Sequence, residues 1–115
     1  MFIDTRAMGF RLTDAIQTHA ESRVARALGF ASQCISRVVT RLEDVNAERG
    51  GVDKRCQIVA FVSGQTPVVA QDVKTDLYAA IDVAAARLRT AVLRQLKRRV
   101  ALPRRLAARS ANRKA

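Results

Sequence analysis

Residue types that support catalysis are scarce in this 115-residue sequence, which has one histidine, two cysteines and no tryptophan. A single imidazole without a cluster of cysteines or carboxylates does not make a metal site. Motifs of the form G-x-x-x-x-G-K-[ST], G-x-G-x-x-G and H-E-x-x-H are also missing. We therefore expect a non-enzymatic protein with no catalytic residues, no cofactor, no metal and no small-molecule substrate.

Long apolar segments are missing as well. No apolar run approaches the length that spans a bilayer. The opening "MFIDTRAMGFR" lacks the basic start and apolar stretch of a secretory signal. These absences predict a cytoplasmic protein that makes no membrane contact. Cys34 and Cys56 fit that compartment as free thiols.

Acidic residues are absent after Asp82, so the positive charge is unevenly distributed. The net charge is +11, from 21 basic and 10 acidic residues. Residues 97–115 hold eight of the bases and no acid, which leaves 13 bases against 10 acids, or +3, for residues 1–96. Such a balance attracts polyanions. We interpret residues 1–100 as one folded domain and residues 101–115 as a basic, disordered tail.

Hydrophobic periodicity predicts the order β-α-β-β-β-α. Alternating or strand-favouring segments, separated by loops at 46–53 and 63–66, predict four strands: 2–8, 34–45, 54–62 and 67–73. Thr13 is placed to cap a helix over 14–28 that Gly29 ends, and a second helix starts near Asp76, with Pro103 as its limit. We expect an α+β fold, a four-stranded sheet with both helices packed on one face.

The faces of these elements indicate where the core and the charge lie. In the long helix one apolar stripe has helical spacing: Leu77, Ile81, Ala84, Leu88, Ala91 and Val92. Arg87, Arg94 and Arg98 form a row beside that stripe, and His19, Arg23 and Arg26 form a similar edge on the first helix. The open sheet face is expected to carry Arg37, Val39, Arg41, Arg55, Val59 and Phe61.

A basic helix edge is commonly just a solvated surface, but such a surface normally mixes signs. Acids are missing from the second half of this helix. If the helices lie side by side, the two rows would flank one basic groove suited to folded RNA, because phosphate contacts require charge and spacing.

Two segments resemble the ribosome hibernation factors, the family of the ribosome-associated inhibitor and hibernation promoting factor, also described as sigma-54 modulation proteins. "DLYAAID" (76–82), opening the last helix, is similar to the family signature, and "TDAIQTHAESRVARALGF" (13–30) resembles its first helix. The resemblance covers about residues 1–100. The sequence resembles the short members of the family, which lack a second domain. Among these, some pair ribosomes and others keep them single, and the sequence leaves this open.

The resemblance implies a stress or stationary-phase factor that binds the small ribosomal subunit and its ribosomal RNA. Such a factor would occupy the channel for messenger and transfer RNA and inhibit translation. By position, the family's basic residues correspond to Arg23, Arg26, Arg87 and Arg94, and helical geometry adds Arg98. Thr90 and Val73 depart from positions that are often basic. Further candidate RNA contacts are His19, Lys74, Lys97, Arg104 and Arg105.

Two other interpretations remain open. A protein-interaction module that modulates a sigma factor would use Val39, Val59 and Phe61 as its docking patch. A generic double-stranded RNA-binding module has a related element order, but its basic cluster is replaced here by the acidic "TDLYAAID". In the ribosome-binding interpretation, reversing Arg87 and Arg94 to Glu is expected to lower ribosome affinity by far more than about tenfold and to change stability only slightly.

Overall fold

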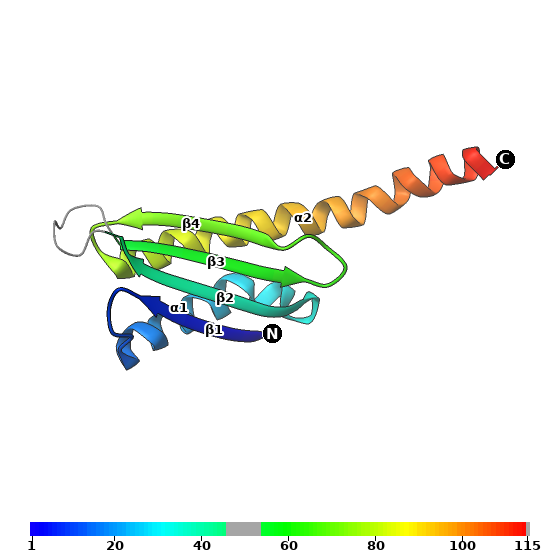
Figure 1. The fold of residues 1–115 in the computed structure, drawn as a ribbon. Helices are drawn as coiled ribbons and strands as arrows, with labels where there is room; N and C mark the ends of the chain where they lie inside the picture. The colour runs from blue at the N-terminus through cyan, green and yellow to red at the C-terminus, as the bar shows by residue number, and fades with distance from the viewer. Residues whose placement is uncertain (46–53, 115) are drawn as a thin grey trace.

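The computed structural model describes residues 1–45 and 54–114, with side chains described as far as residue 98. The elements are β1 (Phe2–Met8), α1 (Asp14–Leu28), the 3₁₀ helix η1 (Gly29–Cys34), β2 (Ile35–Asp44), β3 (Lys54–Val62), β4 (Val68–Lys74) and α2 (Leu77–Lys114). The predicted α+β fold is confirmed. The sheet order is β1-β2-β3-β4, and both helices pack on one face of the sheet (Figure 1).

The sheet is mixed because α1 separates its first two strands. β1 pairs parallel with β2, whereas β2, β3 and β4 form the expected antiparallel meander. A parallel pair requires a crossover connection, which α1 supplies. The register of β2 shifts by one residue between Ile35 and Arg37. Cys56 lies opposite Leu42 and not beside Cys34, and both thiols are free.

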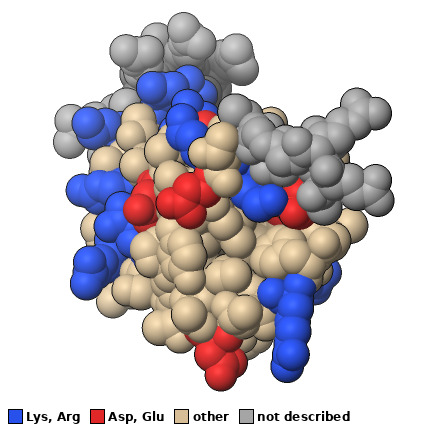
Figure 2. Space-filling view, turned by 90° about the vertical axis from the view of Figure 1, so that its left-hand side faces the viewer, with Lys and Arg blue, Asp and Glu red and all other residues tan. Residues whose placement is uncertain are grey.

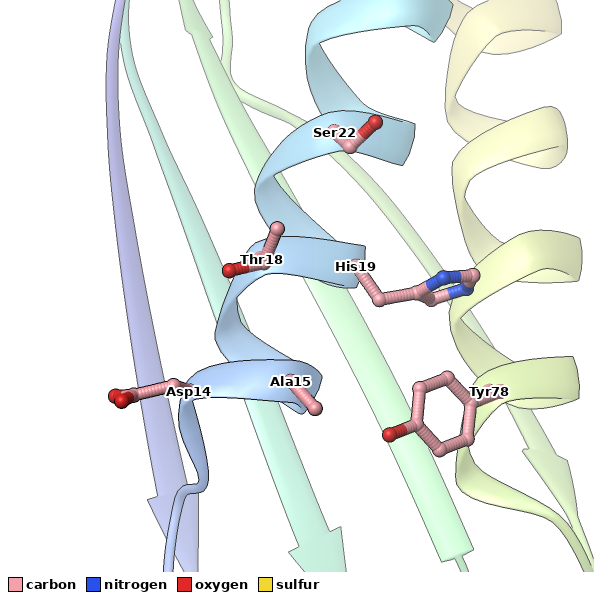
Figure 3. Close-up of a pocket in the computed structure, with 6 residues that line it drawn as sticks. All are labelled: Asp14, Ala15, Thr18, His19, Ser22 and Tyr78. Carbon is pink, nitrogen blue, oxygen red and sulfur yellow. The ribbon is translucent and has the colours of Figure 1, made fainter.

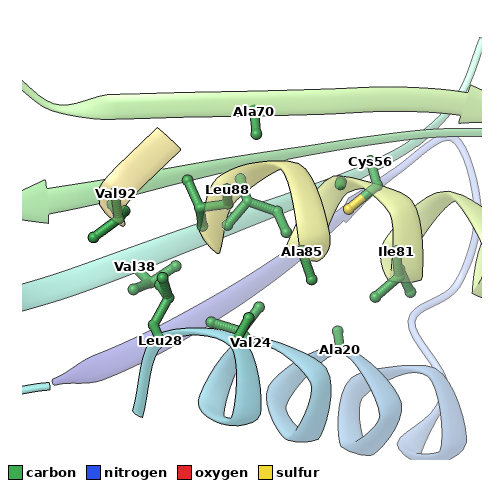
Figure 4. Close-up of a cluster of buried hydrophobic side chains, with 14 of the residues drawn as sticks. Ala20, Val24, Leu28, Val38, Cys56, Ala70, Ile81, Ala85, Leu88 and Val92 are labelled. Carbon is green, nitrogen blue, oxygen red and sulfur yellow. The ribbon is translucent and has the colours of Figure 1, made fainter. Parts of the chain in front are cut away.

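The core lies between the sheet and the helices (Figure 4). Ala20, Val24 and Leu28 of α1 and the predicted α2 stripe are buried, except that Ala91 is only half-buried. Ala80 and Ala85 of α2 are buried in addition. The buried face of α2 is therefore wider than one stripe, because this helix packs against α1 as well as against β3 and β4.

The helix ends differ in part from their predictions. Thr13 caps α1 as expected, since its Oγ1 accepts a hydrogen bond of 3.2 Å from the Ile16 amide. Gly29 follows the last residue of α1 but stays right-handed (φ −56°), so the chain tightens into η1 instead of reversing.

The prediction that Pro103 limits the long helix is wrong, because α2 runs to Lys114 and extends beyond the sheet (Figure 1). Proline has no N–H to give to the preceding turn, but the loss of one bond can bend a helix without ending it. The division into a folded domain, residues 1–100, and a basic, disordered tail, residues 101–115, stays a prediction.

The open sheet face carries the expected residues, but the apolar ones among them are less exposed than a docking patch requires. Val39 is buried, and Val59 and Phe61 are half-buried. The Arg37 guanidinium carbon lies 4.9 Å from the centre of the Phe61 ring and covers it. Among the apolar side chains of this face, Phe2, Met8 and Val69 are exposed.

Candidate nucleic-acid interface

The two helices lie side by side and enclose a groove between them. Arg23 and Arg26 of α1 and Arg89 of α2 line it, with Ala27, Ala85 and Ala86 as the small residues around them and a cavity volume of about 230 Å³. We call this the arginine groove. The arginine that α2 contributes to this groove is Arg89, which the sequence analysis did not predict. Arg89 follows Asp82 by seven residues, two helical turns, so placing α1 beside Asp82 would have identified it.

Arg87 and Arg94 lie on the other flank of α2. They line a second depression of about 360 Å³ together with Ala86, Thr90 and Ala91. Ala86 contributes to both depressions, so short side chains separate the two sets of arginines. The sequence predicted that the arginine row of α2 and the basic edge of α1 would flank one groove. That prediction is wrong, because Ala86 separates Arg87 and Arg94 from the arginine groove.

Arg87 is held in place by the neighbouring strand. Its Nη1 donates a hydrogen bond of 2.9 Å to Asp72 Oδ1 and another of 2.9 Å to the Gln71 carbonyl oxygen. The Asp72 side chain is only 8% exposed, and its Oδ2 lies 3.6 Å from Lys74 Nζ, an ion-pair distance too long for a hydrogen bond. Arg87 thus compensates the buried charge of Asp72 on β4. Most of the Arg87 side chain is nevertheless exposed to solvent.

A second aspartate organises the start of the arginine groove. Asp82 Oδ1 lies 2.7 Å from His19 Nε2 and 3.0 Å from Arg23 Nε, the latter an ion pair without the alignment of a hydrogen bond. His19 and Tyr78 meet edge to face, with ring centres 4.9 Å apart, above an open pocket (Figure 3). The contacts of Tyr78 and Asp82, both in the "DLYAAID" segment, therefore tie α2 to α1.

The remaining predicted contacts differ in their surroundings. Arg26, Arg94, Lys97 and Arg98 are exposed, and within the described part of the chain none of them forms an ion pair. Figure 2 shows Lys and Arg side chains gathered along the margin of the molecule that the helices form. Arg104 and Arg105 lie outside the described side chains.

The chemistry of the other polar groups is limited. Burial, followed by the charge of Asp72, raises the pKa of the Cys56 thiol to about 12, which leaves it protonated and unreactive at neutral pH. Among the described residues, no cluster of three His, Cys, Asp or Glu side chains could hold a metal ion. No described helix is long and apolar enough to cross a membrane.

Comparisons with known proteins agree with the fold. Residues 3–100 match the model of a family described as Sigma 54 modulation protein / S30EA ribosomal protein. A ribosomal subunit interface protein from Coxiella burnetii has a similar structure, with a TM-score of 0.73 and 18% identity over 84% of this chain and 99% of that chain. The N-terminal domain of Thermus thermophilus Protein Y gives a TM-score of 0.67 and 28% identity over 82% of this chain and 98% of that chain. No curated protein sequence matches significantly.

Proposed function

Because this chain belongs to the Sigma 54 modulation protein / S30EA ribosomal protein family, we propose that it is a non-enzymatic ribosome-binding factor of the cytoplasm. It binds the small ribosomal subunit through ribosomal RNA, occupies the channel for messenger and transfer RNA, and inhibits translation in resting or stressed cells. Residues 1–100 form the binding domain, and residues 101–115 add a basic extension.

The observation that carries this proposal is the arrangement of arginines on the helical face. The arginine groove and the pair Arg87 and Arg94 lie on either side of short residues, Ala86 and Thr90. Because the side chains between the two sets of arginines are short, a sugar–phosphate backbone can approach α2 closely. Guanidinium groups can then bind its phosphates with two parallel hydrogen bonds. The proposed RNA contacts are thus Arg23, Arg26, Arg87, Arg89, Arg94 and Arg98, with His19, Lys74, Lys97, Arg104 and Arg105 at the periphery.

Cosedimentation with purified small and large ribosomal subunits at increasing salt tests the proposal. We expect binding to the small subunit that weakens steeply with salt, because phosphate neutralisation releases counterions. The double variant Arg26→Glu/Arg94→Glu should lower small-subunit affinity by more than about tenfold. The matched control is Arg37→Glu/Arg41→Glu, which makes the same change in net charge on the open sheet face and should bind nearly as the wild type does.

Three outcomes would count against the proposal. Absence of small-subunit binding at low salt would refute it. Equal weakening by both double variants would show that net charge, and not the helical face, determines binding. Equal affinity for a plain RNA duplex and for small subunits would favour a generic double-stranded RNA binder. Adding the protein to a translation extract and running a sucrose gradient then tests inhibition, and reports whether ribosomes become paired.

A further inference from the structure

An exposed aromatic ring lies beside the arginine groove. Phe30 is in η1, directly after α1, and is 47% exposed. The Arg89 guanidinium carbon lies 5.0 Å from the centre of its ring. The same Arg89 lines the arginine groove with Arg23 and Arg26. One cation therefore connects an exposed aromatic face to a set of phosphate-binding side chains.

This combination fits one chemical class of ligand. An unpaired nucleotide has a flat base that stacks on aromatic rings and on guanidinium planes, and a phosphate on each side that attracts cations. A helical RNA segment keeps its bases inside and would use only the arginines. Phe30 adds a contact that phosphates alone do not use, since its ring has no charge and no hydrogen-bond donor.

We infer that Phe30 and Arg89 form a stacking site for one unpaired nucleobase, whose flanking phosphates lie toward Arg23 and Arg26. The inference rests on the proposed RNA-binding function and adds a base contact to it. The base can come from an unpaired residue of ribosomal RNA or from a free single strand such as a messenger. Both sources offer the same stacking surface, so the experiment distinguishes them.

The absence of tryptophan from the chain makes this site directly observable. Phe30→Trp introduces a single indole at the proposed site, and a base stacked on an indole quenches its fluorescence. The control is Phe2→Trp, which places the indole on the open sheet face at a residue that is 65% exposed. Each variant is titrated with a short single-stranded RNA and with an abasic RNA backbone of the same length.

We expect the RNA with bases to quench Phe30→Trp strongly, the abasic backbone to quench it little, and Phe2→Trp to respond weakly to both. In the second arm, small-subunit affinity is measured for Phe30→Leu and Phe30→Tyr. Loss of the aromatic ring should lower affinity about tenfold, whereas Tyr should retain it. Thermal denaturation of both variants verifies that each is folded.

The two arms separate the sources of the base. Quenching by the short RNA supports stacking of a free single strand. An effect of Phe30→Leu on subunit affinity without such quenching supports a base presented by folded ribosomal RNA. If the bases make no difference to quenching and Phe30→Leu binds subunits as Phe30→Tyr does, the stacking site is refuted. That result leaves the proposed function intact as long as the wild type still binds small subunits.

Discussion

The contact between Arg87 and Asp72 predicts that two arginines on the same helix have unequal effects on stability. Arg87→Glu removes a cation whose Nη1 lies 2.9 Å from an aspartate that is 8% exposed, and replaces it with a like charge. Arg94→Glu changes an exposed side chain that forms no ion pair within the described residues. Sequence reasoning expected both changes to leave stability almost unaltered, and the structure revises that expectation for Arg87.

The size of the effect follows from burial. Removing one partner of a fully buried ion pair costs about 3–5 kcal/mol. Here the Arg87 side chain is 57% exposed and Lys74 Nζ remains 3.6 Å from the carboxylate, so solvent and a second cation reduce the penalty. We expect Arg87→Glu to lower the free energy of unfolding by about 1–3 kcal/mol. Arg94→Glu should lower it by about 0.5 kcal/mol or less.

Thermal denaturation followed by circular dichroism measures this difference. At about 4 °C per kcal/mol for a domain of this size, Arg87→Glu should lower Tm by roughly 4–12 °C, and Arg94→Glu by about 2 °C or less. Adding Asp72→Asn to Arg87→Glu removes the like-charge contact and should recover part of the loss. Equal Tm values for the two single variants, or no recovery in the double variant, would refute the argument that Asp72 depends on Arg87.

Three further expectations concern the core and the backbone. Leu88→Ala truncates a side chain with 0% exposure and should cost about 2–5 kcal/mol in chemical denaturation, with small-subunit binding lost only as the fold is lost. At pH 8 a thiol reagent should label Cys34 before Cys56, because a pKa raised to about 12 keeps the Cys56 thiolate scarce until the pH approaches that value; equal rates in the native protein would contradict this. Gly9→Ala should cost about 1–2 kcal/mol in the same denaturation assay, since φ is +84° and a Cβ would lie 3.2 Å from the Asp44 carbonyl oxygen; an unchanged midpoint would contradict it.

Periodicity was sufficient to predict the four strands, the two α-helices and most of the core, because each depends on local pattern. Cys56, Ile58, Ala60 and Val62 alternate along the sequence, and they form the buried face of β3. Pro103 was misjudged because a local rule about one missing N–H was applied without the continuous helix-favouring sequence around it. The parallel pairing of β1 and the width of the buried face of α2 depend on which elements become neighbours, which periodicity does not specify.

For the candidate site as well, features within one helix were predicted from the sequence, whereas features that depend on neighbouring elements were not. The helical wheel correctly placed Arg87 and Arg94 together and Arg23 and Arg26 together. It did not determine which flank of α2 faces α1, and therefore assigned the wrong row to the groove and missed Arg89. Ion pairs between distant segments could not be predicted from the sequence either. Asp72 and Asp82 look like ordinary surface acids until β4 and α1 are placed beside α2.

The two aspartates divide the cations of the helical face into two kinds. Asp82 holds Arg23 through Nε, and Asp72 holds Arg87 through Nη1. A guanidinium has five N–H donors, so each held arginine keeps donors for a phosphate, and its side-chain entropy has already been reduced by folding. For the proposed RNA partner, these held cations would fix the position of docking, because folded RNA presents phosphates at set spacings. Arg26 and Arg94, which have no carboxylate partner among the described residues, would instead add salt-dependent attraction. If the proposed RNA binding holds, acids within this basic surface would not simply weaken it: they would restrict the arrangement of arginines that an RNA has to match.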